Sequence, residues 1–216
     1  MNSELKITKF IHACFSVDLE DQSLVVDPVV LTTDFVMPKN VVGVIITHQH
    51  ADHIDKNLIN DIVRQNPGVT IYTIDDVETG HPDQTEFVSA GRTIEVGPFG
   101  LEFFGGAHRP IHKDWPICKN LGVMINDEIY YPGDSLTLPE RPVKILALPI
   151  AAPWLKTAEA MDFLMEIKPK KAFATHDAVL SPAGKQFVDN WINMAAEKVG
   201  SRYQTATSLA TSQQID

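Results

Sequence analysis

Thr47-His48-Gln49-His50-Ala51-Asp52-His53 places four metal-ligand-type side chains on one short turn, between a predicted strand and a predicted helix. Alternate side chains of an extended backbone point the same way, so His48 and His50 can converge on one cation. The turn into the helix then directs Asp52 and His53 elsewhere. Four such groups cannot all reach a single tetrahedral ion, but they can serve two neighbouring ions. The stretch therefore predicts a centre that holds two metal ions.

The apolar run 41–47 that leads into this turn predicts a strand buried on both faces. The stretch 87–104, which is broken by Gly91 and Gly97, predicts a meander of short antiparallel strands. Residues 121–125 and 128–131 predict a hairpin around Asn126-Asp127. Runs of β-branched and aromatic residues predict the remaining strands over 5–10, 14–19, 23–27, 69–74, 143–148 and 171–175.

Three helices are predicted. Apolar residues at three- and four-residue spacing from Ile54 to Val63 predict the first, which Asn66-Pro67-Gly68 ends. Thr157 is predicted to cap a second helix that runs through Ile167. Ser181 and Pro182 predict the start of a third. Its predicted apolar face consists of Phe187, Val188, Trp191, Ile192 and Ala195. For the tail after Gly200, an edge strand and disorder both remain open.

The composition fits one α/β domain over 1–216, with layered sheets covered by helices. The net charge of −10 argues against a general nucleic-acid binder, although bound cations would still let an acidic protein hold an anionic substrate. No apolar run is long enough to cross a bilayer, and the N-terminus lacks the pattern of a secretory signal. With two cysteines, Cys14 and Cys118, both more plausible as packing residues than as a disulfide, we expect a cytoplasmic protein.

At this point the sequence resembles the metallo-β-lactamase superfamily, whose HxHxDH signature is matched by His48, His50, Asp52 and His53. Asp27-Pro28 before the signature and three later ligand-type positions come in the family's order. Motifs around His12, Asp134 and Pro149 are similar to the ascorbate-6-phosphate-lactonase-like branch of metal-dependent hydrolases. The resemblance implies an αββα sandwich, in which two mixed β-sheets are flanked by helices.

The resemblance also implies a ligand set. The first metal would be held by His48, His50 and His108, and His112 is an alternative to His108 because it lies four residues further on. Asp52, His53 and His176 would hold the second metal, with Asp134 as the bridge. Zn2+ suits these ligands best, and Mn2+, Fe2+ and Ni2+ are compatible with them.

Four other residues are candidates for substrate contact or for support of the ligands. His12 follows an apolar strand and could line the mouth of the site, and Asp27 could orient a metal-bound imidazole. Arg109 and His112 could recognise an anionic group of a substrate. Each has a plainer interpretation as a structural histidine, a turn residue or a solvated loop residue. Trp154 is a candidate for the pocket wall, although packing beneath the following helix is the stronger expectation.

Two cations that share a water lower its pKa toward about 7 and polarise a carbonyl or phosphoryl oxygen. We therefore expect a metal-bridging hydroxide to attack a small-molecule ester, lactone, thioester or phosphodiester, with Asp52 and Asp134 orienting it or handling its proton. The alternatives are a superfamily nuclease, for which we see no basic substrate-binding arm, an iron-dependent redox enzyme, and a non-catalytic metal-binding module. The oligomeric state stays open and includes a homo-oligomer.

Overall fold

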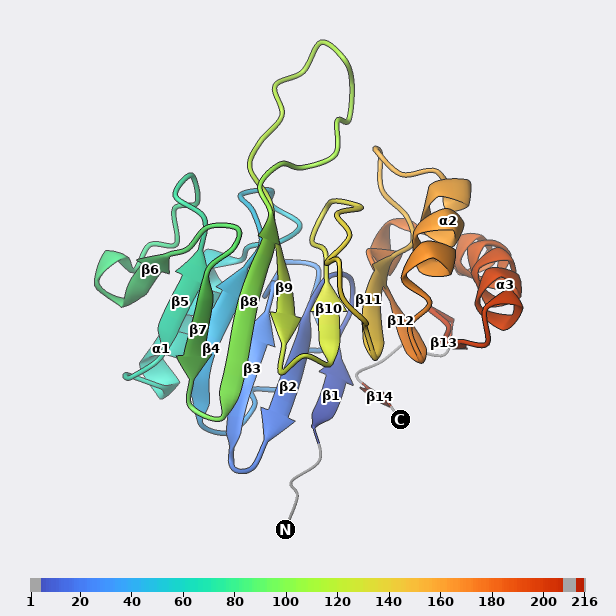
Figure 1. Cartoon of the computed structure of the whole chain (residues 1–216). Helices are drawn as coiled ribbons and strands as arrows, with labels where there is room; N and C mark the ends of the chain where they lie inside the picture. The colour runs from blue at the N-terminus through green and yellow to red at the C-terminus, as the bar shows by residue number, and fades with distance from the viewer. Residues whose placement is uncertain (1–4, 208–212, 216) are drawn as a thin grey trace.

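The strands of the computed structural model form two mixed sheets of seven strands each (Figure 1), and the structure describes residues 5–207 and 213–215. In spatial order, sheet A contains β14 (Gln213–Ile215), β1 (Lys6–Lys9), β2 (Phe15–Leu19), β3 (Gln22–Val26), β4 (Val41–Ile46), β5 (Thr70–Thr73) and β6 (Thr85–Phe87). Sheet B contains β13 (Arg202–Gln204), β12 (Lys171–Thr175), β11 (Ile145–Pro149), β10 (Ile129–Tyr131), β9 (Leu121–Ile125), β8 (Phe99–Gly105) and β7 (Thr93–Val96). Each sheet has an antiparallel half and a parallel half.

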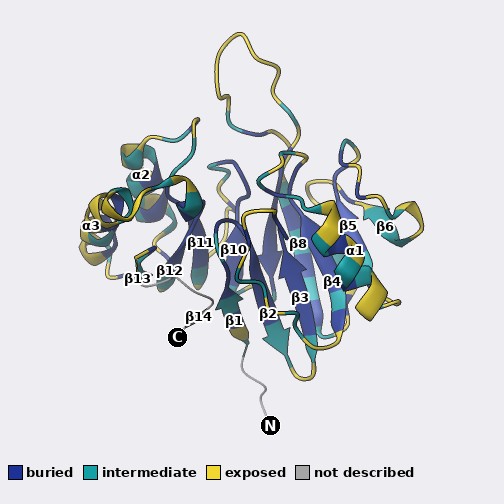
Figure 2. Ribbon diagram, turned by 180° about the vertical axis from the view of Figure 1, so that it is seen from behind, coloured by how far each residue is buried: buried dark blue, intermediate teal, exposed yellow. Residues whose placement is uncertain are grey.

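The three helices connect parallel strands, which cannot be joined by a tight turn. α1 (Lys56–Gln65) links β4 to β5 and lies against sheet A (Figure 2). α2 (Thr157–Ile167) and α3 (Pro182–Lys198) follow β11 and β12 and pack side by side on the parallel half of sheet B. Two short 3-10 turns, Pro82–Gln84 and Asp177–Val179, complete the elements. The αββα arrangement implied by the resemblance is confirmed.

The apolar faces of the two sheets pack against each other and form the core. The Phe15 ring of sheet A meets the rings of Tyr131 and Phe173 of sheet B, with ring centroids 5.5 Å apart in both pairs. All three side chains are fully buried. β4, whose residues are almost all buried, lies in the interior of sheet A, as its continuous apolar sequence predicts.

The hairpin between β9 and β10 has the predicted turn. Asn126 and Asp127 both adopt positive φ (52° and 53°), the conformation of the two central residues of a type I′ turn. The tail after Gly200 contributes edge strands: β13 borders sheet B, and β14 pairs with β1 at the border of sheet A. The rest of the tail, 208–212 and 216, lies outside the described residues.

Three local predictions are wrong, the first only in part. The meander predicted over 87–104 is confirmed from Thr93 onward, where β7 and β8 form an antiparallel pair in sheet B, but it is wrong at Phe87, which ends β6 and pairs in parallel with β5 in sheet A. Thr157 is the first residue of α2, and the cap is Lys156, whose backbone N–H donates to Glu159 at 3.0 Å. On α3 the buried face passes through Val188, Ile192, Ala195 and Ala196, which leaves Phe187 and Trp191 exposed.

Candidate metal centre

The predicted site residues gather at one end of the sandwich, where β3, β4, β8, β10 and β12 all end. A backbone hydrogen bond from Leu121 of sheet B to the carbonyl of Thr47 joins the two sheets there (3.0 Å). The long loop 106–120 projects from the same end (Figure 1). Segments far apart in sequence therefore bring their side chains together because they leave the sheets at a common edge.

The turn after β4 separates its four ligand-type side chains into two directions. His48 and His50 approach each other, with His48 Nε2 3.1 Å from His50 Nδ1. The backbone N–H of His53 donates to the His50 carbonyl (2.9 Å), which closes the turn. The His53 ring lies beside the His48 ring, with centroids 3.9 Å apart, and its Nε2 lies 2.7 Å from His176 Nε2. His48 and His53 are fully buried, whereas the Asp52 side chain is 39% exposed.

Asp134 lies between two histidine groups and presents one carboxylate oxygen to each. Its Oδ2 lies 3.2 Å from His108 Nε2 and 4.0 Å from His48 Nε2. Its Oδ1 lies 3.2 Å from His53 Nε2 and 2.7 Å from His176 Nε2. The groups His48, His50, His108, Asp134 and His53, Asp134, His176 thus each place their donor atoms close enough to hold one ion.

The distances between the donor atoms, like the residue types, suit bound cations. Two donors that bind one tetrahedral zinc ion at about 2.0–2.2 Å lie roughly 3.3 Å apart. Several of the donor pairs above fall near that value. Within the described chain, His108 Nε2 and Asp134 Oδ1 are buried, and although each lies close to the other group's atoms, neither makes a hydrogen bond of good geometry. Buried polar atoms are rarely left unpaired, so these atoms fit a pair of bound cations.

A third group consists of His12, Asp52 and His176. His12 is fully buried, and its Nε2 lies 3.4 Å from Asp52 Oδ2. The main chain of His12 is held by the segment after β12: its N–H donates to Asp177 Oδ1 (3.2 Å) and its carbonyl accepts from the N–H of His176 (3.3 Å). Asp177 in turn forms ion pairs with Lys9 and Lys185. Contacts of its main chain therefore fix the position from which His12 faces Asp52 and His176.

The Asp27 carboxylate stabilises the turn 47–53 through hydrogen bonds. Its Oδ2 accepts hydrogen bonds from His53 Nδ1 (2.7 Å), Thr47 Oγ1 (2.8 Å) and Tyr131 Oη (2.9 Å). Because a carboxylate can only accept, the Nδ1 of His53 carries a proton and its Nε2 faces the site. Burial, followed by the nearby Asp27 charge, raises the pKa of Tyr131 well above its usual value, so Tyr131 remains a donor.

Asp134 is held by one donor, Trp154, and one acceptor, Asn120, neither of which the sequence singled out for this role. The indole Nε1 of Trp154 donates to Asp134 Oδ2 (2.8 Å), and the backbone N–H of Asp134 donates to Asn120 Oδ1 (2.8 Å). A buried indole needs an acceptor, which is the signal that could have linked Trp154 to the site. Gly133 precedes Asp134 at φ 60°, and a Cβ there would lie 2.4 Å from Asn120 Oδ1, so a glycine is required.

Three non-glycine residues of the site adopt positive φ: His12 (67°), Asp27 (42°) and His176 (63°). This conformation costs about 1–3 kcal/mol for each such residue and persists only where surrounding contacts enforce it. Residues held in this way cluster at functional sites. The strain is therefore a second, independent sign that this end of the fold is functional.

The electrostatics of the site favour cations. Burial holds the pKa of His48 well below its usual value and lowers the pKa of His50, so both present neutral rings. Burial alone would raise the pKa of Asp134, but His176 and His53 outweigh it and keep that pKa well below its ordinary value. For His53, burial is likewise outweighed by Asp134 and Asp27, and its pKa rises to about 10.

The remaining candidates lie further out. His112 is 55% exposed and is in none of the three groups formed by the described residues; it lies 3.8 Å from Asp114. Arg109 is half-exposed and forms an ion pair with Glu159 (2.8 Å), so its charge is already matched. Cys14 and Cys118 are free thiols, and Cys118 Sγ lies 3.6 Å from His50 Nε2.

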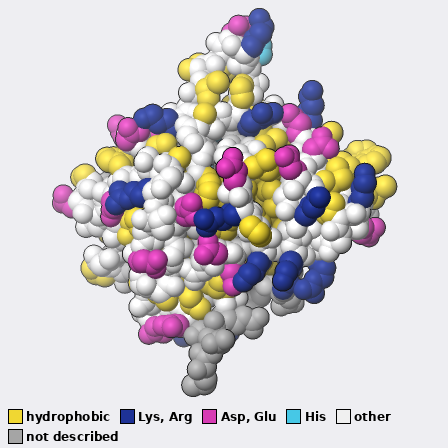
Figure 3. Space-filling view, viewed as in Figure 1, with side chains coloured by type: hydrophobic (Ala, Val, Ile, Leu, Met, Phe, Trp, Pro, Cys, Tyr) yellow, Lys and Arg dark blue, Asp and Glu magenta, His cyan; other side chains and the backbone are white. Residues whose placement is uncertain are grey.

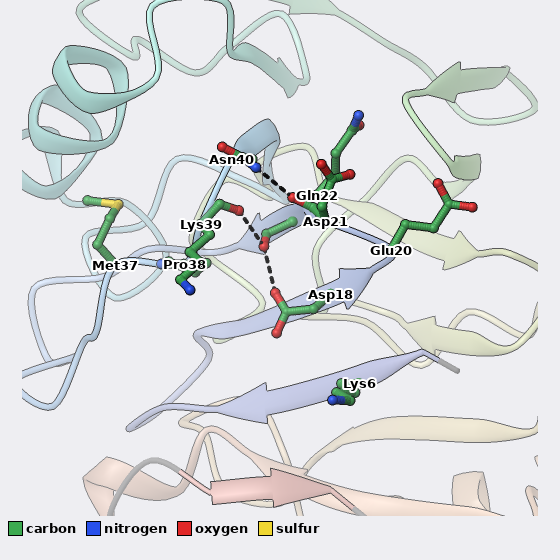
Figure 4. A pocket seen from close by; sticks show the side chains of 10 residues that line it. Lys6, Asp18, Glu20, Asp21, Gln22, Met37, Pro38, Lys39 and Asn40 are labelled. Carbon is green, nitrogen blue, oxygen red and sulfur yellow. Dashed lines mark hydrogen bonds between the residues drawn. The ribbon is translucent and has the colours of Figure 1, made fainter. Parts of the chain in front are cut away.

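A hollow of about 740 Å³ lies away from these residues, where the β2–β3 turn meets the start of β4 (Figure 4). Its polar groups are engaged with one another: Ser23 Oγ donates to Asp18 Oδ1 (2.6 Å), and Asn40 Nδ2 donates to the Asp21 carbonyl (2.8 Å). It contains no histidine or cysteine. The histidine-rich end of the sandwich is therefore the candidate site.

Comparison with known proteins shows the family of the chain. Residues 6–176 match the beta-lactamase superfamily domain. The chain belongs to this superfamily. Protein Rv0786c of Mycobacterium tuberculosis is 29% identical over 183 residues, which cover 82% of this chain and 86% of the relative.

Solved structures show the same superfamily fold. Igni18, a metallo hydrolase from Ignicoccus hospitalis, is 17% identical with a TM-score of 0.73, and the match covers 98% of both chains. The metallo-beta-lactamase fold protein YhfI from Bacillus subtilis is 15% identical with a TM-score of 0.68, over 98% of this chain and 100% of YhfI. The chain is thus a beta-lactamase-superfamily protein with the metallo-β-lactamase fold, and it carries a His/Asp cluster.

Proposed function

We propose that this protein is a hydrolase that uses two divalent cations to cleave a small-molecule ester, lactone or phosphodiester. The observation that carries the proposal is the position of Asp134, with one carboxylate oxygen toward each of two histidine groups. In this proposal His48, His50 and His108 hold one cation, and Asp52, His53 and His176 hold the other. Zn2+ is the preferred occupant, and Mn2+, Fe2+ or Ni2+ suit the same side chains.

When bound, the cations would supply a water of lowered pKa and polarise the oxygen of the scissile group. The chain's own residues prepare the site for this chemistry. Asp27 fixes the His53 ring, and Trp154 and Asn120 fix Asp134. Asp52, which stays partly exposed, lies at the mouth of the site, where it would orient the nucleophile. Hydrolysis of an ester would add water across the acyl C–O bond and release an acid and an alcohol.

Access to the site favours catalysis over a purely structural metal role. Structural metal sites are closed by protein ligands, whereas catalytic sites keep a position open to water and substrate. The Asp52 side chain is 39% exposed, and His50 is only half-buried. The cluster therefore reaches the surface, which supports an enzyme.

A nuclease of the same superfamily is the weaker candidate. The net charge is −10. On the face of the molecule that Figure 3 shows, Lys and Arg side chains are interspersed with Asp and Glu side chains. Phosphate backbones are bound by clustered basic side chains.

Among the described residues, no helix combines the length and the hydrophobicity that a membrane-spanning segment needs. The cytoplasmic location stays a prediction.

Elemental analysis of the protein purified from its native source, coupled to a panel of lactones, esters, thioesters and phosphodiesters with and without chelator, tests the proposal. We expect about two equivalents of metal and turnover of a small molecule that is lost on chelation and restored by metal. Asp134→Ala and His50→Ala should abolish turnover while leaving the fold largely intact. Normal metal content and normal hydrolysis in either variant would refute the assignment, and cleavage of RNA alone would favour the nuclease.

A further inference from the structure

A pocket of about 300 Å³ opens directly beside the first histidine group. Its floor includes His50, His108 and Cys118, and its walls come from the projecting loop: Pro110, Ile111, Trp115, Pro116 and Ile117. Because two proposed metal ligands border it, anything bound in this pocket lies against the reacting centre.

The walls are apolar although they are exposed to solvent. Ile111 is 45% exposed, Trp115 is 65% exposed and Ile117 is 55% exposed. Hydrophobic side chains lie along the projecting loop below its charged tip (Figure 3). Covering apolar surface that would otherwise contact water is favourable, so this loop favours an apolar occupant.

The charged side chains beside the pocket are already paired. Arg109, which borders it, bonds to Glu159 (2.8 Å). At the tip, Lys113 lies 3.6 Å from Asp114. The pocket therefore offers hydrophobic contact rather than a free cation for an anionic group, and its size is at the lower end of the range for small-molecule sites.

We propose that this pocket binds a short aliphatic or aromatic substituent of the substrate, so that the substrate is an apolar ester or lactone. This inference rests on the proposed hydrolytic function for its kinetic test, and direct binding tests the pocket separately. The specificity comes from Trp115 and Ile117, which contact the substituent and not the scissile bond.

Two homologous ester series provide the kinetic test: p-nitrophenyl acetate to hexanoate, which lengthens the acyl group, and methyl to hexyl acetate, which lengthens the alcohol. In the metal-loaded protein we expect kcat/KM to rise about two- to fourfold per methylene in at least one series, since one buried methylene contributes about that factor. Trp115→Ala and Ile117→Ala should flatten the rise. Trp191→Ala, which removes an exposed tryptophan from α3, should leave it unchanged.

Direct binding is measured with 1-hexanol on the protein as purified, in a Trp191→Phe background. A blue shift of tryptophan emission that saturates with 1-hexanol is expected as the alcohol covers Trp115, and Ile117→Asp should weaken binding at least tenfold while keeping the reporter. If kcat/KM does not change with chain length in either ester series and the tryptophan emission does not respond to 1-hexanol, the pocket proposal is overturned. If no ester is cleaved but 1-hexanol binds and Ile117→Asp abolishes it, the pocket stands and the hydrolase proposal fails.

Discussion

The Nε2 atoms of His53 and His176 lie 2.7 Å apart in a fully buried site. Two imidazole lone pairs at that distance repel unless a proton or a cation lies between them. Asp27 fixes the proton on Nδ1 of His53, and Asp134 and Asp27 together raise the pKa of His53 to about 10 despite burial. In the metal-free protein, a proton on His53 therefore occupies the position that a cation would take.

Binding of metal near pH 7.5 should therefore release at least one proton for each protein. The sign follows from the raised pKa: His53 is protonated before binding and must lose that proton, because only a free imidazole nitrogen binds metal. His48 and His50 have lowered pKa values and are already neutral, so they add nothing to the release. Calorimetric titration with zinc in buffers of different ionisation enthalpy measures the number of protons released. A value of zero or net uptake would contradict this electrostatic picture, and the contribution from His53 should disappear above about pH 10.

Asp27→Asn should weaken metal binding about 10- to 100-fold, the usual effect of losing a carboxylate behind a metal-bound histidine. The amide cannot accept from all three donors, His53, Thr47 and Tyr131, so the His53 ring loses its fixed orientation. Competition with a chelator measures the affinity. Tyr131→Phe, which removes one donor, provides a milder variant should Asp27→Asn fail to fold.

Asp18→Asn is the matched control for this prediction. Asp18 also accepts a side-chain hydrogen bond, from Ser23, but it borders the hollow of Figure 4. Metal affinity should be unchanged in Asp18→Asn. An Asp27→Asn protein that folds and binds metal as tightly as the parent would remove Asp27 from its supporting role.

The strand ends of this protein could be predicted because its apolar runs stop where ligand-type residues begin. β4 ends at Ile46, and only Thr47 separates it from His48. β12 ends at Thr175, directly before His176. Parallel strands that leave a sheet in one direction bring such residues to a common edge. The αββα fold and the position of the histidines at one end of it follow from that pattern together with the resemblance to the superfamily.

Contacts between segments far apart in sequence could not be predicted. Neither periodicity nor turn residues show that β6 stays in sheet A while β7 begins sheet B, since both strands are short and similarly amphipathic. The bond from Trp154 to Asp134 depends on the path of the β11–α2 connection. On α3, the stripe through Phe187 and the stripe through Val188 are adjacent, and only the packed structure decides which one is buried.

The choice between His108 and His112 as a ligand of the first metal yields a direct test. His108 is almost fully buried with its Nε2 3.2 Å from Asp134, whereas His112 is exposed near the tip of the projecting loop. His108→Ala should reduce the bound metal by about one equivalent, and His112→Ala should leave two. Metal content after gel filtration measures both. The opposite result would mean that the loop folds down and that His112 replaces His108.

His12 should strengthen binding of the second cation because it positions Asp52. The Nε2 of His12 is 3.4 Å from Asp52 Oδ2, and Asp177 with its two lysine partners keeps His12 in place. Without this imidazole the partly exposed Asp52 can rotate into solvent. His12→Ala should therefore weaken one of two metal-binding steps at least tenfold and leave the other within about twofold. His12→Gln, whose amide can still donate to Asp52, should recover much of the loss. Stepwise titration with Co2+, followed by its visible absorption, separates the two steps. Equal weakening of both steps, or no recovery in His12→Gln, would show that His12 only supports the fold of its turn.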